Sequence, residues 1–257
     1  MSSMSLNEWV RYRNILKRLS QTAADEFRDA VWGTGGRWNA VGLDGIPRDE
    51  LISYAYALVT KYGEGSAAVA CQLYDEIAEL SGASVPPAMP AQTPSINEVA
   101  KALNGTIKVS ENEEYVSSTV GRLVKQVGQD TTLQNALRDG AEAAWIPSGD
   151  TCAFCITLAS RGWQHVTKKT LKNGHAEHIH ANCDCAYGVR FDSSFNVDGY
   201  DPDTYLGIYN EADGNLNTMR RDFYAKNSDK INDQKRSAYA KMRARESSAA
   251  EELNIGN

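Results

Sequence analysis

Apolar residues recur at helical spacing through the first part of the chain. From Leu6 to about Trp32 they follow steps of three and four residues, which predicts one long amphipathic helix. The series is Trp9, Val10, Ile15, Leu16, Leu19, Ala23, Phe27 and Val31. The run Gly33-Thr-Gly-Gly36 then ends the pattern. Because this run follows a helix and lacks the Gly-Lys-Ser/Thr ending of a phosphate-binding loop, we interpret it as a turn.

Two more helices are predicted before residue 82. One begins after Pro47, where Asp49 and Glu50 lie favourably in the first turn, and it is expected to break at Tyr62-Gly-Glu-Gly65. The other covers residues 66–80. Together with the first helix, they predict a helical N-terminal domain.

A proline-rich segment follows, over residues 83–95. Its four prolines exclude a regular helix or strand, so we interpret it as an extended linker and as the clearest domain boundary of the chain. Beyond it, the spacing of apolar residues predicts helices over 95–103, 111–127 and 131–144.

The pattern changes at Trp145-Ile-Pro147, where a short strand or turn is expected, and a strand is predicted over 186–191. Helices are predicted again over 205–212 and 218–250. The expected fold class is α+β, with a mainly helical N-terminal half, a small Cys/His-rich α+β module and a helical, basic C-terminal tail. The predicted segments are 1–82, 83–95, 96–144, 145–195 and 196–257.

Cysteine and histidine are concentrated in one region. Four of the five cysteines and all four histidines lie between Cys152 and Cys185. Buried cysteines that act as small apolar residues would be scattered, whereas a metal needs several soft ligands gathered from two short loops. Cys71, in an alanine-rich helical stretch, fits the first description. The cluster therefore predicts a site.

The spacing within the cluster suits zinc. Cys152 and Cys155 form a C-x-x-C pair, which brings two thiolates within reach of one ion. Cys183 and Cys185 share one face of an extended chain, and His180 lies three residues before Cys183. We expect Cys152, Cys155, His180 and Cys183 to bind a structural Zn2+, with Cys185 as the substitute for His180. A disulfide and reduced thiols without metal are the alternatives.

The motifs of two enzyme classes, zinc deaminases and small nucleases, bear on the same region. His175-Ala-Glu177 matches the H-x-E of zinc deaminases, but there the C-x-x-C follows the H-x-E and has a proline before it, whereas here it comes first. The paired His-His or His-Asn core of small nucleases is not seen. A zinc-dependent nuclease or transferase is the alternative function, and we expect no enzyme.

Charge is unevenly distributed along the chain. The net charge is −6, yet residues 215–245 carry nine Lys or Arg against three Asp, a net +6 that leaves −12 on the remainder. A basic tail on an acidic body indicates an acidic partner, either double-stranded DNA or an acidic protein surface, and a solvated cationic helix face is the alternative. The candidate DNA-binding residues are Arg220, Arg221, Lys226, Lys235, Arg236 and Lys241. With no apolar run near the roughly 18 residues of a membrane span and no signal peptide, we expect no membrane partner and a cytosolic origin.

The run Trp145-Ile-Pro-Ser-Gly-Asp-Thr-Cys152-Ala-Phe-Cys155-Ile-Thr-Leu-Ala-Ser-Arg161-Gly162, followed by His180-Ala-Asn-Cys183-Asp-Cys185, resembles a known motif. It is similar to the C-terminal motif of the Mu-F-type minor head, or head morphogenesis, proteins of tailed bacteriophages. The match covers Trp145 to Phe191. Asp184 departs from the pattern, because an arginine is frequent at that position.

The resemblance implies a minor capsid protein that is encoded beside the portal, packaged in few copies, and in contact with portal and capsid proteins and with DNA. It places the protein in the phage head, and in the host cytoplasm during assembly, with no established enzymatic activity. Some similar proteins carry ADP-ribosyltransferase modules, which need an Arg, then Ser-Thr-Ser, then Glu-x-Glu. That order is not found, because Ser117-Ser-Thr119 follows Glu111-Asn-Glu113.

Overall fold

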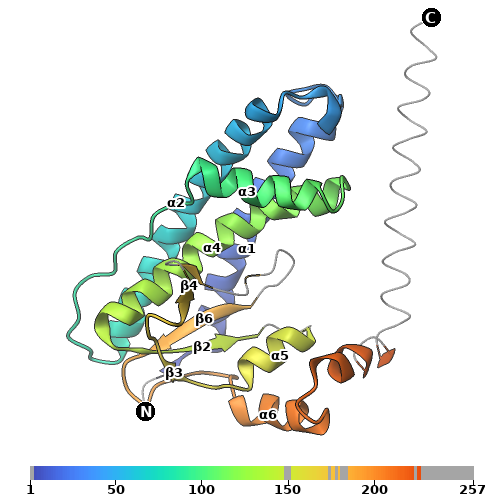
Figure 1. Ribbon diagram of the computed structural model, residues 1–257. Helices are drawn as coiled ribbons and strands as arrows, with labels where there is room; N and C mark the ends of the chain where they lie inside the picture. The colour runs from blue at the N-terminus through green and yellow to red at the C-terminus, as the bar shows by residue number, and fades with distance from the viewer. Residues whose placement is uncertain are drawn as a thin grey trace, which may run out of the picture.

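The computed structural model describes residues 3–147, 152–172, 175–176, 179, 185–222 and 225–226 of the chain, and its architecture is α+β, as predicted (Figure 1). The helices are α1 (Leu6–Trp32), the short η1 (Leu43–Gly45), α2 (Arg48–Leu80), α3 (Ile96–Ile107), α4 (Glu113–Asp139), α5 (Ala153–Ala159) and α6 (Pro202–Glu211). The strands are β1 (Ser3–Met4), β2 (Glu142–Ile146), β3 (Gln164–His165), β4 (Leu171–Lys172), β5 (His175–Ala176), β6 (Ala186–Arg190) and β7 (Asn196–Val197).

Local capping defines the starts of two helices. The Ser5 hydroxyl accepts a hydrogen bond from the Glu8 N–H, and the Glu8 carboxylate accepts one from the Ser5 N–H. Two backbone N–H groups at the start of α1 thereby gain partners that the helix itself does not supply. Ser95 and Glu98 form the same reciprocal pair at the start of α3. The predicted helix from Leu6 to Trp32 is confirmed, as is the turn after it.

The predicted break in the second helix is wrong, because α2 is continuous through Tyr62-Gly-Glu-Gly65. Gly63 is buried where α2 meets α4, and a Cβ built there would lie 3.0 Å from Cγ2 of Val127. The missing side chain permits the close approach of the two helices. Helix packing thus outweighs the roughly 1 kcal/mol by which a glycine disfavours a helix interior.

The two helices predicted over 111–127 and 131–144 are likewise one helix, α4, and its last predicted residues belong to β2. The polar residues from Gln129 to Thr132, at the junction of the two predicted helices, are buried and helical. The Thr131 hydroxyl donates to the Val127 carbonyl at 2.8 Å, and the Thr132 hydroxyl donates to the Gly128 carbonyl at 3.2 Å. Because these groups find partners within the helix, burial does not break it.

Helix α4 lies at the centre of the helical half, packed against α1, α2 and α3 (Figure 1). One apolar cluster, the bundle core, fills the part of the helices remote from the sheet, with Phe27, Leu51 and Val120 among its members. A second, the module core, joins Trp9 of α1 and Tyr74 of α2 to residues of the cysteine-containing region. The small module therefore shares its core with the helical half.

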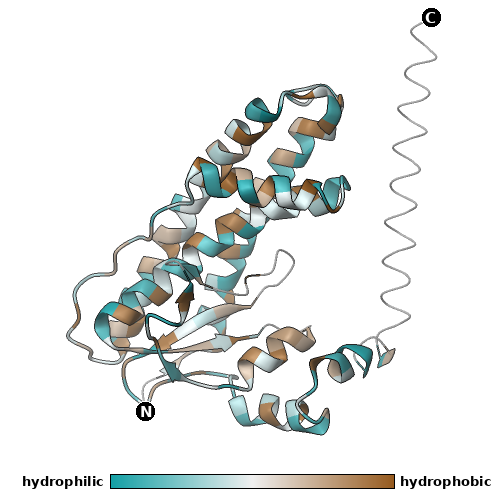
Figure 2. Cartoon of the chain, viewed as in Figure 1, coloured by the Kyte–Doolittle hydropathy of each residue, from teal (hydrophilic) through white to brown (hydrophobic). Residues whose placement is uncertain are grey.

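The main sheet has three antiparallel strands in the order β3-β2-β6. Ile146 lies opposite Ala186 at one end of the β2–β6 pair and Glu142 opposite Arg190 at the other, where the two charged side chains form an ion pair. The predicted strand over 186–191 is confirmed as β6, and the strand predicted near Trp145 as β2. Helix α5, predominantly apolar in Figure 2, packs against β2.

Residues 83–95 have no helix or strand and are bonded to α4. Asn135 accepts a hydrogen bond from the Met89 N–H at 2.9 Å and donates one to the Met89 carbonyl at 2.8 Å. The Ala91 N–H donates to the Thr131 hydroxyl at 3.0 Å. The proline-rich segment is thus held along α4 by side chains of that helix.

Within the described part of the chain, no helix has the length and apolar character needed to cross a membrane.

The contact between α1 and α4 predicts the effect of a substitution. A Cβ at Gly121 would lie 2.7 Å from the Ser20 carbonyl oxygen, so Gly121→Ala should lower the free energy of unfolding by about 1–3 kcal/mol. Gly105→Ala is the matched control, because a Cβ there meets nothing within 4 Å, and it should raise stability by up to about 1 kcal/mol. Urea unfolding followed by circular dichroism measures both. Equal stabilities for the two variants would contradict this packing.

Candidate functional site

Two of the predicted metal ligands lie at the start of α5. Cys152 is the N-cap residue of this helix, and Cys155 is in its first turn, with no exposed surface. The C-x-x-C pair therefore lies in the start of a helix and not in a separate turn. Cys185 is 3% exposed and directly precedes β6.

The structure brings these three cysteines to one apolar cluster. Cys155 and Cys185 belong to the module core, and Cys152 packs against it. The other predicted ligands, His180 and Cys183, lie outside the described residues. Among the described residues, no group of three metal-binding side chains is close enough to hold an ion. The zinc site stays a prediction.

Helix α5 also supports the beginning of the basic tail. Ala153 forms a small apolar cluster with Ala212 and Met219, and the Thr157 hydroxyl lies 3.8 Å from the Met219 sulfur. Residues 216–222 are helical. The Asn215 side chain accepts hydrogen bonds from two backbone N–H groups at the start of this helix. The cysteine motif and the tail are therefore joined through α5.

The structure describes half of the candidate DNA-binding residues. Arg220, Arg221 and Lys226 are exposed, and Arg221 has an ion pair of 3.7 Å with Asp222. The other three, Lys235, Arg236 and Lys241, lie outside the described residues. DNA binding stays a prediction.

A histidine between two carboxylates connects three elements. Nδ1 of His175 in β5 lies 2.7 Å from Oδ2 of Asp130 in α4, and its Nε2 lies 3.0 Å from Oε1 of Glu98 in α3. The second carboxylate oxygen of Asp130 accepts a hydrogen bond from the Ala176 N–H. We call this group, His175, Asp130 and Glu98, the histidine clamp. Both ring nitrogens have carboxylate partners without any metal.

The clamp places one imidazole between two carboxylates, so a protonated ring leaves a net charge of −1 when both carboxylates are ionised. The hydrogen bond with the buried Asp130 carboxylate raises the pKa of His175 to about 9, so the ring is a cation at neutral pH. Hydrogen bonds from Ser95 at the helix start, and then from His175, lower the pKa of Glu98. Burial raises the pKa of Asp130, while the bonds from His175 and Ala176 act in the opposite direction.

The sequence analysis considered His175 but missed its partners. Asp130 lay between the helices predicted over 111–127 and 131–144, and its burial within one continuous α4 comes only from the structure. Such a residue is almost never fully buried without a partner. The identity of that partner had no local signal, since His175 is 45 residues away in the sequence.

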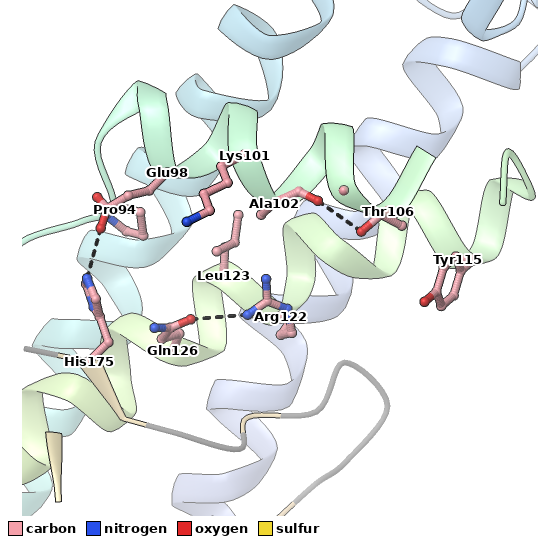
Figure 3. A pocket seen from close by; sticks show the side chains of 11 residues that line it. Pro94, Glu98, Lys101, Ala102, Thr106, Tyr115, Arg122, Leu123, Gln126 and His175 are labelled. Atoms are coloured by element: carbon pink, nitrogen blue, oxygen red, sulfur yellow. Dashed lines mark hydrogen bonds and ion pairs between the residues drawn. The ribbon is translucent and has the colours of Figure 1, made fainter. Parts of the chain in front are cut away.

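A groove of about 420 Å³ opens between α3 and α4 beside the clamp (Figure 3). Lys101 and Arg122 point toward the space between the two helices, and Gln126 accepts a hydrogen bond from Arg122 at 3.3 Å. Glu98 and His175 line one end of the groove. The sequence analysis did not identify this groove.

Comparison with known proteins gives one match. A family model described as VG15 protein matches residues 3–212, which include the long helices, the sheet, the cysteine motif and α6. No curated protein and no solved structure matches the chain.

The histidine clamp predicts a pH-dependent stability. Because the folded pKa of His175 is raised to about 9, its contribution is full below the ordinary value of 6.5 and is lost as the pH rises through about 9. The advantage of the wild type over His175→Gln should therefore shrink by about 1–2 kcal/mol across this interval, allowing for the partly exposed ring. Urea unfolding at several pH values measures it.

His165→Gln is the control for this experiment, because the His165 side chain is 74% exposed and lies 3.6 Å from Glu142. Its stability difference from the wild type should stay constant over the same pH range. If the curve of His175→Gln also runs parallel to that of the wild type, the ionised clamp is refuted.

Proposed function

Because the chain belongs to the VG15 protein family and is phage-encoded, we propose that it is a minor structural protein of the phage head. In this proposal it is packaged in few copies, contacts portal and capsid proteins during head assembly, and resides in the virion. The similarity of Trp145–Cys185 to the motif of Mu-F-type minor head proteins supports the proposal. The family match covers that motif and the helical half together.

The position of the motif is the observation that carries the proposal. Its described cysteines lie in or against the module core, which also contains Trp9 of α1 and Leu133 of α4. Close packing in a shared core holds the motif in a fixed position relative to the helical half. This favours an assembly role for the motif, with no reaction assigned to it.

We propose a structural zinc ion within the motif. Its four ligands would be Cys152, Cys155, His180 and Cys183, with Cys185 as the substitute for His180, because thiolates and imidazoles are suitable zinc ligands. Of the described cysteines, Cys155 and Cys185 lie in the module core and Cys152 packs against it, and these three by themselves do not form a group close enough to hold an ion. A bound zinc would tie the start of α5 to the start of β6 and supply folding free energy to the module.

We further propose that the basic tail contacts DNA or an acidic face of the portal. Arg220, Arg221 and Lys226 are exposed, and the helix that carries the first two is anchored on α5 by Met219. Anchoring would hold the cations in a defined direction relative to the body of the protein. Because the residues outside 215–245 carry −12 together, an acidic partner is favoured at the basic segment and disfavoured elsewhere.

The head assignment predicts that the protein is a component of the particle. Quantitative mass spectrometry of purified particles of the encoding phage should detect the chain at a level far below that of the major capsid protein. Particles lacking the DNA should contain it too, since it would assemble before packaging. A protein that is abundant in the infected cell but missing from particles would overturn the assignment.

The zinc proposal predicts the metal content of the purified protein. Elemental analysis of protein prepared without chelator or histidine tag should give close to one zinc per chain. Cys155→Ser should lose the zinc and lower the thermal midpoint, because the ligand is removed from a folded site. Cys71→Ser, outside the motif, is the control and should keep the metal. Metal-free protein with a midpoint insensitive to chelator would sink the proposal.

A further inference from the structure

The groove between α3 and α4 combines cationic and apolar groups on two facing helices. On α3, Lys101 and Gly105 are four residues apart and so lie on one face. On α4, Arg122 and Gln126 have the same spacing. Gly105 leaves the groove open, because a Cβ there would meet nothing within 4 Å. Side chains from both helices thus surround one accessible space (Figure 3).

Neither cation in the groove has an acidic partner among the described residues. Lys101 is exposed and has no ion pair there. Arg122 is half-buried, and its hydrogen bond goes to the neutral Gln126 side chain at 3.3 Å. Burial lowers the pKa of Arg122, because withdrawal of water from the guanidinium disfavours its charged form, and no carboxylate among the described residues compensates. An anion in the groove would supply that missing interaction.

The nearest carboxylate in the groove is already engaged. Glu98 bonds to His175 at 3.0 Å and to the Ser95 N–H at 2.7 Å, as part of the helix cap. The imidazole of His175 lies between this carboxylate and that of Asp130. The charges on Lys101 and Arg122 therefore remain available to a ligand.

The surroundings favour a single carboxylate over a polyanion. The chain outside residues 215–245 carries −12, and Glu111, Glu113 and Glu114 lie between the end of α3 and the first turn of α4. Such an environment repels a phosphate backbone. Ala102 and Leu123 supply apolar lining. This combination suits a short peptide segment with one acidic and one apolar side chain.

We propose that the groove binds an acidic side chain of a polypeptide partner. The carboxylate accepts hydrogen bonds from Arg122, whose planar guanidinium retains donors beyond the one given to Gln126, and pairs with Lys101. The Gln126 amide nitrogen donates a further bond, since its oxygen is the acceptor for Arg122. An adjacent apolar side chain packs on the partly exposed Ala102. This binding site is independent of the proposed role in the head.

The test begins with selection of short peptides from a random library on the full-length protein. Selected sequences should contain Asp or Glu next to an apolar residue, and fluorescence anisotropy should show at least about tenfold weaker binding when that acid becomes its amide. Arg122→Gln should remove this difference, and Lys101→Gln should weaken binding several-fold. Lys108→Gln, at the end of the same helix but outside the groove, should have no effect.

A second variant separates lost binding from lost folding. Gly105→Glu places a carboxylate one turn from Lys101, in space that is open, so the protein should keep its thermal midpoint while losing the selected peptides. Selection without acidic enrichment, or binding unchanged by both Arg122→Gln and Gly105→Glu, would overturn the proposal. Duplex DNA whose binding, unlike that of peptides, depends on Arg122 would overturn it as well.

Discussion

The fold depends on a stretch of buried polar side chains in the middle of α4. Gln129 accepts a hydrogen bond from the Tyr187 N–H of β6, Asp130 accepts one from the Ala176 N–H of β5, and Thr131 accepts one from the Ala91 N–H. Each of these donors would otherwise be unpaired, at a cost of about 1–3 kcal/mol when fully buried. One helix thereby determines where two strands and the proline-rich segment lie.

Two different regions of α4 contribute to the module core and to the groove. One region of α4 packs against the module, where Leu133 joins the core that includes Cys155 and Cys185. Another faces α3, where Arg122 lies in a groove without an acidic partner among the described residues. The histidine clamp connects the two regions, since His175 bonds to both Asp130 and Glu98. A change in the clamp would therefore affect the position of α3 and the groove beside it.

A shared core joins the cysteine motif to the long helices. Trp9 and Tyr74 are almost fully buried, in the same cluster as Trp145. The basic segment is attached to this body through Met219, which packs against Ala153 of α5. For a head protein, this arrangement would present a packed body and a basic segment. One partner could bind through contacts with the body and another through charge attraction to the basic segment.

The sequence by itself determined the features that depend on near neighbours. The starts of α1 and α3 follow from Ser-x-x-Glu capping pairs, and the crowding of Cys and His residues identified the motif region. Only the tertiary structure decided that α2 and α4 are continuous and that His175 meets Asp130. At Gly63 the local preference is for a break, and the close packing of α2 against α4 near Val127 outweighs it. Capping joins residues a few positions apart, whereas helix crossings and buried ion pairs join distant segments that the folded chain brings together.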